Sequence, residues 1–241
     1  MDERIARIAH AIKQAERILL ITGAGLSADS GLPTYRGVGG LYNGHTAEGL
    51  PIEAALSGHM LQRDPALCWK YLAELGKACL GAQANAGHYA IAELQRRKPQ
   101  CWLLTQNIDG YHRAAGSPMD RVIEIHGELA PLYCQSCGAE DAELASHRAG
   151  VLRPPVVLFE EMLPEQAIGT LYDEVRKGFE VVISIGTSAS FPYIVEPLLR
   201  TRQAGGFTVE INPQRTDLSG RVNVHLQGRA LDVLPELLSH I

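Results

Sequence analysis

The stretch that decides the fold of this 241-residue chain is ILLITGAGLSADSGLPTYRG, residues 18–37. It opens with a short apolar run, which is typical of a strand buried in a parallel sheet. From Gly23 the pattern is G-x-G-x-x-A, close to the dinucleotide-binding fingerprint, whose glycines allow a tight turn and a close approach of backbone N–H groups to a pyrophosphate. An ordinary turn between a strand and a helix explains the spacing equally well. Glu48 is in the range for a ribose-binding acid, about 20 residues later, but in a glycine-rich loop rather than at a strand end.

The end of this stretch, Ser30 to Gly37, is too irregular for the crossover helix that a plain Rossmann unit would have here. It contains a proline, an aromatic ring and a guanidinium group, the last two supplied by Tyr35 and Arg36. Beside a phosphate cradle, such a loop predicts a lid over a bound ligand. The alternative is a surface loop in which the tyrosine lies along the protein and the arginine is solvated.

Composition and charge restrict the class of protein. A hydrophobic fraction of 46% with 6% aromatic residues suits a soluble α/β protein. A net charge of −5 offers no electrostatic case for binding nucleic acid or an anionic membrane. The acidic start Met1-Asp2-Glu3 has no signal-peptide pattern, and no apolar run is long enough to cross a bilayer. The five scattered cysteines then predict reduced thiols in the cytoplasm.

Alternating helix and strand patterns along the chain predict an α/β fold with a doubly wound, Rossmann-like parallel sheet. We expect strands at 18–21, 101–105, 122–125, 152–159, 181–185, 207–211 and 222–226. Helices are expected at 3–15, 51–61, 65–80, 88–97, 163–177, 193–203 and 230–241. The core would then comprise residues 1–36, 98–131 and 154–241, interrupted by a helical insertion at 37–97 and a small insertion at 132–153.

Four strand ends of such a sheet would meet at one edge, and each carries small or polar residues: 23–25, 106–109, 126–127 and 186–188. Among these residues only His126 titrates near neutral pH, so it is the candidate general base. The alternative is a histidine that is merely hydrogen-bonded within a turn. His112 competes for the role from a predicted helical turn away from the strand end.

Asn107 and Asp109 lie two residues apart at the second of these strand ends. On an extended segment such residues point the same way. An amide and a carboxylate together offer a donor and acceptors, which a carboxamide such as that of nicotinamide requires. The alternative is an Asx turn that only closes the strand.

Six stretches of the sequence, taken together, resemble the sirtuin family of NAD-dependent protein deacylases. They are GAGLSADSGLPTYRG (23–37), TQNID (105–109), IHGEL (125–129), LRPPVVLF (152–159), IGTS (185–188) and EIN (210–212). They occur in the order of the family and span nearly the whole chain, which is far more specific than one glycine motif. The resemblance implies a Rossmann NAD-binding fold with a helical insertion and a small zinc-ribbon insertion.

The resemblance also implies which residues bind NAD. These are Gly23, Ala24, Gly25, Tyr35, Arg36, Gln106, Asn107, Ile108, Asp109, Gly186, Thr187, Ser188, Asn212 and Ala230. The glycine-rich turn would hold the pyrophosphate, and the loop with Tyr35 and Arg36 would contact the cofactor. Residues 106–109 would lie on the nicotinamide side, with Asp109 at the carboxamide. Residues 186–188 and Asn212 would contact the adenosine half, and Ala230 would border the adenine.

The activity that the resemblance implies is NAD-dependent removal of an acyl group from lysine in a protein or peptide. Nicotinamide would leave C1′ of the ribose, and the acyl oxygen would attack that carbon. His126, with Asn107 as the second catalytic residue, would then act on a ribose hydroxyl as general base, and the acyl group would pass to ADP-ribose. A histidine that is neutral at pH 7 suits this task.

The small insertion departs from the family pattern. The zinc insertion of the family uses two C-x-x-C pairs, whereas this chain has the single pair Cys134–Cys137. Ala145 and Arg148 stand about where the second pair would be. Two thiolates do not fill a tetrahedral site. Although His147 or Asp141 could complete one, we expect a metal-free insertion.

Two further departures concern the substrate. Glu160 replaces a family glycine that lets the peptide backbone approach, so peptide docking is where this chain could differ. The opening motif is most similar to the family branch that removes acidic acyl groups, which binds a carboxylate with a tyrosine and an arginine three residues apart. Tyr71 fits that tyrosine as a substrate contact, but Glu74 replaces the arginine. Because two carboxylates repel each other, we expect a neutral acyl chain.

Two rival functions stay open at this point. ADP-ribosyl transfer or NAD hydrolysis would use the same loss of nicotinamide with a different acceptor. The second rival is a catalytically silent module that binds NAD or ADP-ribose. The altered insertion and Glu160 favour both rival functions. His126, Asn107 and Asp109 argue against the silent module, because binding alone needs no general base. A hydride-transferring dehydrogenase fits poorly, since no ribose-binding acid stands at a strand end.

Overall fold

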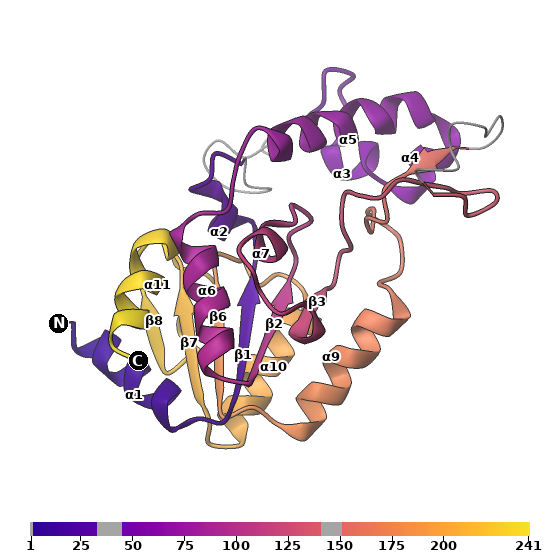
Figure 1. Cartoon of the computed structure of the whole chain (residues 1–241). Coiled ribbons are helices and arrows are strands. Elements are labelled where there is room, and N and C mark those ends of the chain that lie inside the picture. Colours follow the sequence, from indigo (N-terminus) through magenta and orange to yellow (C-terminus); the bar gives the residue numbers. More distant parts are fainter. Residues whose placement is uncertain (1, 33–44, 141–150) are drawn as a thin grey trace.

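The computed structural model describes residues 2–32, 45–140 and 151–241, and its centre is a six-stranded parallel sheet (Figure 1). The strands are β1 (Arg17–Thr22), β2 (Gln100–Thr105), β3 (Val122–Glu124), β6 (Val181–Ile185), β7 (Phe207–Ile211) and β8 (Val224–Leu226). Their spatial order is β3-β2-β1-β6-β7-β8, and every pairing is parallel. The strand order reverses between β1 and β6, as in doubly wound nucleotide-binding folds. The predicted fold class is therefore confirmed.

Helices cover both faces of this sheet, which is why four consecutive residues of β1, from Ile18 to Ile21, are apolar and buried. Ile18 and Leu20 belong to a core shared with helices on one face, whereas Leu19 and Ile21 belong to the core on the other face. The first layer consists of α1 (Glu3–Gln14), α6 (Ala86–Arg97) and α11 (Ala230–Ser239), and the second of α9 (Glu165–Lys177) and α10 (Pro192–Gln203). Because successive side chains of a strand alternate, one apolar run supplies both layers.

Short helices follow two of the strands. α2 (Ala24–Ala28) begins directly after β1, and α7 (Tyr111–Ala114) follows β2. A single 3-10 turn, Met119–Arg121, leads into β3. Among the described residues, no helix has both the length and the apolar character needed to span a membrane.

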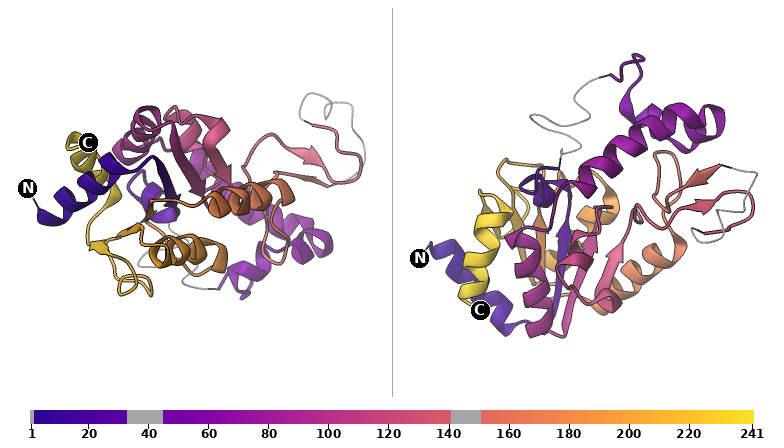
Figure 2. Two further views of the ribbon diagram at one scale, coloured as in Figure 1. Left: turned by 90° about the horizontal axis from the view of Figure 1, so that it is seen from below. Right: turned by 45° about the horizontal axis from the view of Figure 1, so that its top comes forward.

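Of the helical insertion predicted at 37–97, α6 packs on the main sheet, and the helices before it lie at the end of the molecule opposite the two termini (Figures 1 and 2). These helices are α3 (Ile52–Ala55), α4 (Gly58–Arg63) and α5 (Pro65–Leu80), packed around a small apolar core of their own. The helix predicted at 51–61 is wrong as one element, because it breaks at Ser57. The Ser57 hydroxyl accepts the N–H of Met60 and so caps α4, and Ser57 also pairs with Phe159.

The segment 152–159 does not return to the main sheet, so that prediction is wrong as well. β5 (Leu152–Arg153) pairs with β4 (Tyr133–Cys134) in a separate two-stranded antiparallel sheet. Prolines at 154 and 155 lack the N–H groups that a ladder requires. Beyond them only isolated pairs form, between Gly127 and Val156 and between Ser57 and Phe159.

Candidate active site

The carboxyl ends of the central strands surround a cavity of about 840 Å³, located where the strand order reverses. Doubly wound sheets bind ligands at this point. Predicted site residues that line it are Gly23, Ala24, Gly25, Gln106, Asn107, Ile108, His126, Gly186, Thr187, Ser188 and Asn212. Asp109 lines a smaller adjoining pocket instead. Tyr35 and Arg36 lie outside the described residues.

The glycine-rich turn after β1 packs backbone to backbone against the turn after β6. The N–H of Gly25 donates to the carbonyl of Gly186 at 2.8 Å, and that of Gly23 donates to Ile185 at 3.1 Å. A Cβ atom on Gly25 would lie 2.7 Å from the Gly186 oxygen, and Gly186 itself has a φ of +59°. Close packing therefore explains these glycines. The proposed approach of their amides to a pyrophosphate stays a prediction.

Ser27, which belongs to the glycine-rich motif but was not among the predicted site residues, links two of them. Its buried hydroxyl donates to Asp109 at 2.7 Å and accepts from the Asn107 amide at 3.1 Å. Nε2 of His88 lies 3.3 Å away, and Nδ1 of that ring accepts the N–H of Asn85, so Nε2 carries the proton and donates to Ser27. This network holds the amide and the carboxylate side by side. In the sequence, the only sign of this network was that Ser27 is a small residue within the glycine-rich motif.

Asp109 combines the two alternatives predicted from the sequence, an Asx turn that closes the strand and a carboxylate that borders a pocket. One carboxylate oxygen accepts the N–H of Tyr111 at 2.9 Å, which is an Asx turn, and the other accepts from Ser27. Burial raises the pKa of Asp109, while the hydrogen bonds from Ser27 and Tyr111 oppose that rise. Asp109 borders the small pocket together with Asn107 and Ile108.

His126 lies after β3 and lines the main cavity. Its Nδ1 is 3.0 Å from the carbonyl oxygen of Gln106, and its Nε2 is 2.7 Å from the hydroxyl of Tyr193. Burial lowers the pKa of His126, partly offset by the Gln106 hydrogen bond, so the neutral ring is favoured. His112, the competitor, is buried against Thr22 with Nε2 3.0 Å from the threonine hydroxyl, and it does not line this cavity.

Two aromatic residues beside His126 were missed at the sequence level. Phe191 and Tyr193 stack at 5.3 Å between ring centroids, and each ring stands nearly perpendicular to the His126 ring at 6.1 Å. Both line the cavity. They belong to the start of α10, where the sequence indicated only a helix, so no motif pointed to them.

On the other side of the cavity, hydrogen bonds connect residues at the ends of three strands. Gln106 donates to the Thr187 hydroxyl at 2.9 Å, and the Asn212 amide donates to the Thr187 carbonyl at 3.0 Å. Ala230, predicted to border the adenine, is buried at the start of α11 and does not line the cavity. Its neighbour Arg229 does.

Glu160 has a φ of +69°, the left-handed conformation that favours glycine. This conformation accounts for the glycine that the resemblance implies at this position. The turn is held by the neighbouring ion pair, in which the buried Arg153 contacts both oxygens of Glu161 at 2.6 and 2.8 Å. Glu160 itself is exposed and lines the main cavity.

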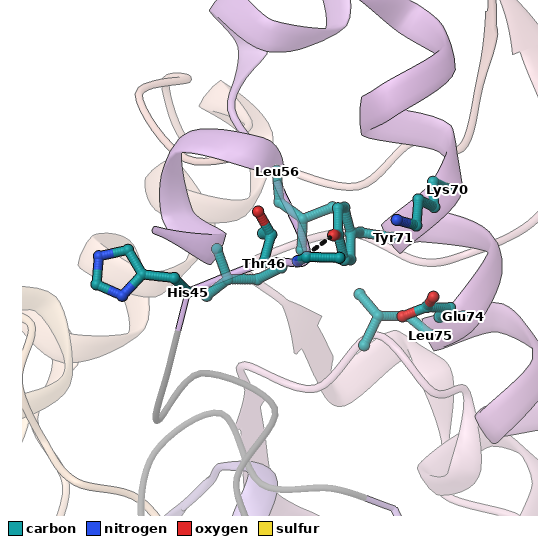
Figure 3. A pocket seen from close by; sticks show the side chains of 9 residues that line it. His45, Thr46, Leu56, Lys70, Tyr71, Glu74 and Leu75 are labelled. Atoms are coloured by element: carbon teal, nitrogen blue, oxygen red, sulfur yellow. Dashed lines mark hydrogen bonds between the residues drawn. The ribbon is translucent and has the colours of Figure 1, made fainter. Parts of the chain in front are cut away.

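Tyr71 lines a different pocket, of about 280 Å³, between α3 and α5 (Figure 3). Its hydroxyl donates to Glu48 at 2.5 Å, and Lys70 pairs with the same carboxylate at 2.6 Å. The hydrogen bonds from Lys70 and Tyr71 lower the pKa of Glu48 to about 2. Glu48 is therefore bound within the helical insertion and not at the main cavity. Glu74 also lines the Tyr71 pocket. That Tyr71 contacts the substrate stays a prediction.

Among the described residues, the cysteine pair has no further ligands that would complete a structural zinc site. Cys134 is buried in β4 and Cys137 is exposed. No group of three or more His, Cys, Asp or Glu able to hold a metal occurs among the described residues. Residues 141–150, where His147 and Asp141 lie, are outside them. Two thiolates leave half of a tetrahedral zinc site unfilled. The metal-free insertion stays a prediction.

Comparison with known proteins supports the resemblance. The sequence model of the Sir2 family matches residues 23–192. A protein of Pseudomonas aeruginosa named NAD-dependent protein deacylase 2 is 72% identical, with 98% of this chain and 97% of that protein covered. A protein of Archaeoglobus fulgidus named NAD-dependent protein deacylase 1 is 36% identical, with 100% and 98% covered.

Solved structures agree. The crystal structure of a Sir2 homologue in complex with NAD has a TM-score of 0.85 to this chain at 33% identity, with 100% of this chain and 93% of that chain covered. An ADP-ribose complex of a mutant Sir2 homologue also reaches 0.85, at 34% identity, with 100% and 96% covered. The similarity extends over the entire fold as well as the motifs, and it confirms the resemblance seen in the sequence. The chain belongs to the Sir2 family.

Proposed function

We propose that this protein is an NAD-dependent protein lysine deacylase that transfers the acyl group of an acyl-lysine to ADP-ribose. The observation that carries the proposal is His126: a neutral histidine whose Nε2 faces a large cavity at the strand-order reversal. Relatives named as NAD-dependent protein deacylases, matched along nearly their whole length, support it.

The cavity residues fit NAD as the substrate that is cleaved. Gly23, Ala24 and Gly25 form a turn that lines the cavity, and the pyrophosphate would lie beside this turn. Thr187, Ser188 and Asn212 would hold the adenosine half. Arg229, which precedes Ala230 and lines the cavity, would also lie near the adenosine half.

The small pocket beside the cavity suits the nicotinamide carboxamide. Asn107, Asp109 and Ser27 border it with donors and acceptors, and its walls include the apolar Ile108 and Leu75. The carboxylate of Asp109 retains lone pairs beyond its two hydrogen bonds. Asn107 would thus orient the end of NAD from which nicotinamide departs.

His126 would take the proton of a ribose hydroxyl during acyl transfer. Its lowered pKa keeps Nε2 unprotonated at neutral pH, which a general base requires. NAD, when bound, supplies the ribose to which the acyl group passes. The peptide would lie along 156–160, which adjoins His126 through the hydrogen bond from Val157 N–H to the His126 carbonyl.

We infer a neutral acyl chain. Tyr71 and Lys70 both contact Glu48, and Glu74 lines the Tyr71 pocket, so a carboxylate on the acyl group would meet an acidic side chain there. If Tyr71 contacts the acyl chain, the contact is made by its ring against the apolar wall with Leu56 and Leu75.

The test is a mass-spectrometric assay with NAD and lysine peptides that are unmodified, acetylated, longer-acylated or succinylated. Nicotinamide and acyl-ADP-ribose should appear together, only with neutral acylated peptide.

His126→Ala should lower acyl-ADP-ribose formation by at least about 100-fold and leave NAD binding largely intact, while His10→Ala, on the remote surface of α1, should behave as wild type. Normal turnover in His126→Ala would refute the assignment. Nicotinamide without deacylation would favour ADP-ribosyl transfer or NAD hydrolysis, and NAD binding alone the silent module.

A further inference from the structure

Nε2 of His126, the nitrogen that should act as base, already has a hydrogen-bond partner in this protein. Nδ1 lies 3.0 Å from the carbonyl oxygen of Gln106, which can only accept, so Nδ1 carries the proton of the neutral ring. Nε2 is then an acceptor. Because Tyr193 Oη lies 2.7 Å from it, the Tyr193 hydroxyl must donate to His126.

Tyr193 is fixed in this position. Its ring stacks on Phe191 with the planes 10° apart, and it stands at 87° to the His126 ring. It lies in the first turn of α10, whose Ile194 and Leu198 are buried in the core against the sheet. Moving the phenol away from Nε2 would break the stack and the hydrogen bond together. A substrate hydroxyl therefore meets Tyr193 before it can reach the nitrogen.

We propose, on the basis of the deacylase function above, that Tyr193 is a catalytic proton relay between the ribose hydroxyl and His126. A phenol can donate one hydrogen bond and accept another at the same time. The ribose O–H bond breaks and its proton passes to Tyr193 Oη, while the original Tyr193 proton passes to Nε2. The ribose oxygen keeps the electron pair and attacks the former carbonyl carbon of the acyl group, which is now an imidate carbon. Its C=N π bond breaks, and that electron pair moves to the lysine nitrogen. Tyr193 ends neutral, and His126 ends as the imidazolium.

The environment of both groups suits this exchange. Burial raises the pKa of Tyr193 to about 12, so the hydroxyl holds its proton at neutral pH until His126 accepts it. Tyr193, His126 and Phe191 all line the cavity, so the lone pairs of Oη can reach a ligand in it. Loss of nicotinamide lies on the Asn107 side and does not involve Tyr193, so the relay predicts a defect in only one of the two steps.

Tyr193→Phe tests the relay, because it removes only the oxygen and keeps the stacked ring. Acyl-ADP-ribose formation should fall by about 10- to 100-fold, somewhat less than a full loss of general-base catalysis. Nicotinamide release measured in a single turnover should stay within about twofold of wild type, and so should the Kd for NAD, since neither needs the phenol. The rate of acyl transfer in H₂O–D₂O mixtures should curve for wild type, where two protons move, and become linear in the variant.

Tyr172→Phe, an exposed tyrosine on α9, is the matched control and should match wild type in every readout. Wild-type acyl transfer in Tyr193→Phe would overturn the relay and leave the deacylase standing. A faster variant would overturn it by showing that Tyr193 obstructs His126. Equal loss of nicotinamide release and acyl transfer would show a structural role only. If wild type itself makes no acyl-ADP-ribose, the deacylase proposal fails and the relay with it.

Discussion

Glu160 shows at the scale of one residue how a departure from the family pattern acts through the backbone. Its φ of +69° is in the left-handed region, which residues with a Cβ atom rarely adopt. Such a conformation costs roughly 1–2 kcal/mol for a residue with a Cβ atom. The adjacent Arg153–Glu161 pair holds the turn in place, because Glu161 also accepts the N–H of Leu158 at 2.9 Å. The strain therefore lies at the edge of the cavity and is maintained by its surroundings.

Replacing Glu160 by glycine should stabilise the protein. The strain relieved exceeds the roughly 0.5–1 kcal/mol that glycine loses through its extra flexibility in the unfolded chain, which leaves a gain of up to about 1 kcal/mol. Urea unfolding should give a higher midpoint for Glu160→Gly than for wild type. Glu160→Ala removes the charge but keeps the Cβ atom, so it should show no gain. Equal midpoints for the two variants would mean that backbone strain is not the cause.

At the scale of elements, the strand–helix turns after β1 and β6 determine the shape of the cavity. They touch through backbone atoms, with Gly25 and Gly186 at the contact and Leu26 N–H directed to the Gly23 carbonyl at 3.0 Å. Neither turn can move alone, because β1 and β6 pair along their whole length. The glycines are therefore needed for the close packing of the two turns, and this packing determines the shape of the ligand cavity.

Gly25→Ala should destabilise the fold by about 2–3 kcal/mol or more, since its Cβ would lie 2.7 and 2.8 Å from Gly186 backbone atoms that cannot give way. Gly76→Ala is the matched control. A Cβ atom at Gly76, inside α5, would meet nothing within 4 Å. That substitution should stabilise by about 0.5–1 kcal/mol. Thermal and urea unfolding of both variants would check the contrast, and a tolerated Gly25→Ala would disprove the packing argument.

At the scale of the whole molecule, stability should depend on two buried histidines. His88 and His112 lie 5.0 Å apart between ring centroids behind the site. Burial lowers the pKa of His88 to about 4 and that of His112 to about 3, the latter also through repulsion by His88. Within the described part of the chain, Nδ1 of His112 has no hydrogen-bond partner. Both rings are therefore neutral in the folded protein, whereas in the unfolded chain they bind protons below about pH 6.5.

The free energy of unfolding should consequently be highest above about pH 6.5 and fall as the pH drops towards 4, by up to about 1.4 kcal/mol per pH unit for each histidine. Asp109 acts in the opposite sense near the acid end, because its raised pKa makes the folded state bind a proton more readily. Urea unfolding between pH 8 and 5 measures the slope. His112→Gln should reduce it by about half. Equal stability of the wild type at pH 7 and pH 5 would contradict this account.

The sequence by itself determined the six strands of the main sheet, the doubly wound fold class, the family and the strand ends that line the cavity. Hydrophobic periodicity is a local property, so the apolar runs at 18–21 and 181–185 identified β1 and β6 without knowledge of their neighbours. Polar residues directly after parallel strands must meet at one edge, which is why residues as distant as His126 and Gly23 were correctly grouped.

Only the tertiary structure decided the features that depend on partners far apart in the chain. Ser57 interrupts a helical pattern because Phe159 pairs with it, and segment 152–159 leaves the sheet because β4 offers a partner to β5. The tautomer of His126 follows from Gln106 on one side and Tyr193, 67 residues away, on the other. Hydrogen-bond direction is set by whichever donor or acceptor the fold brings within about 3 Å, and no local pattern encodes that choice.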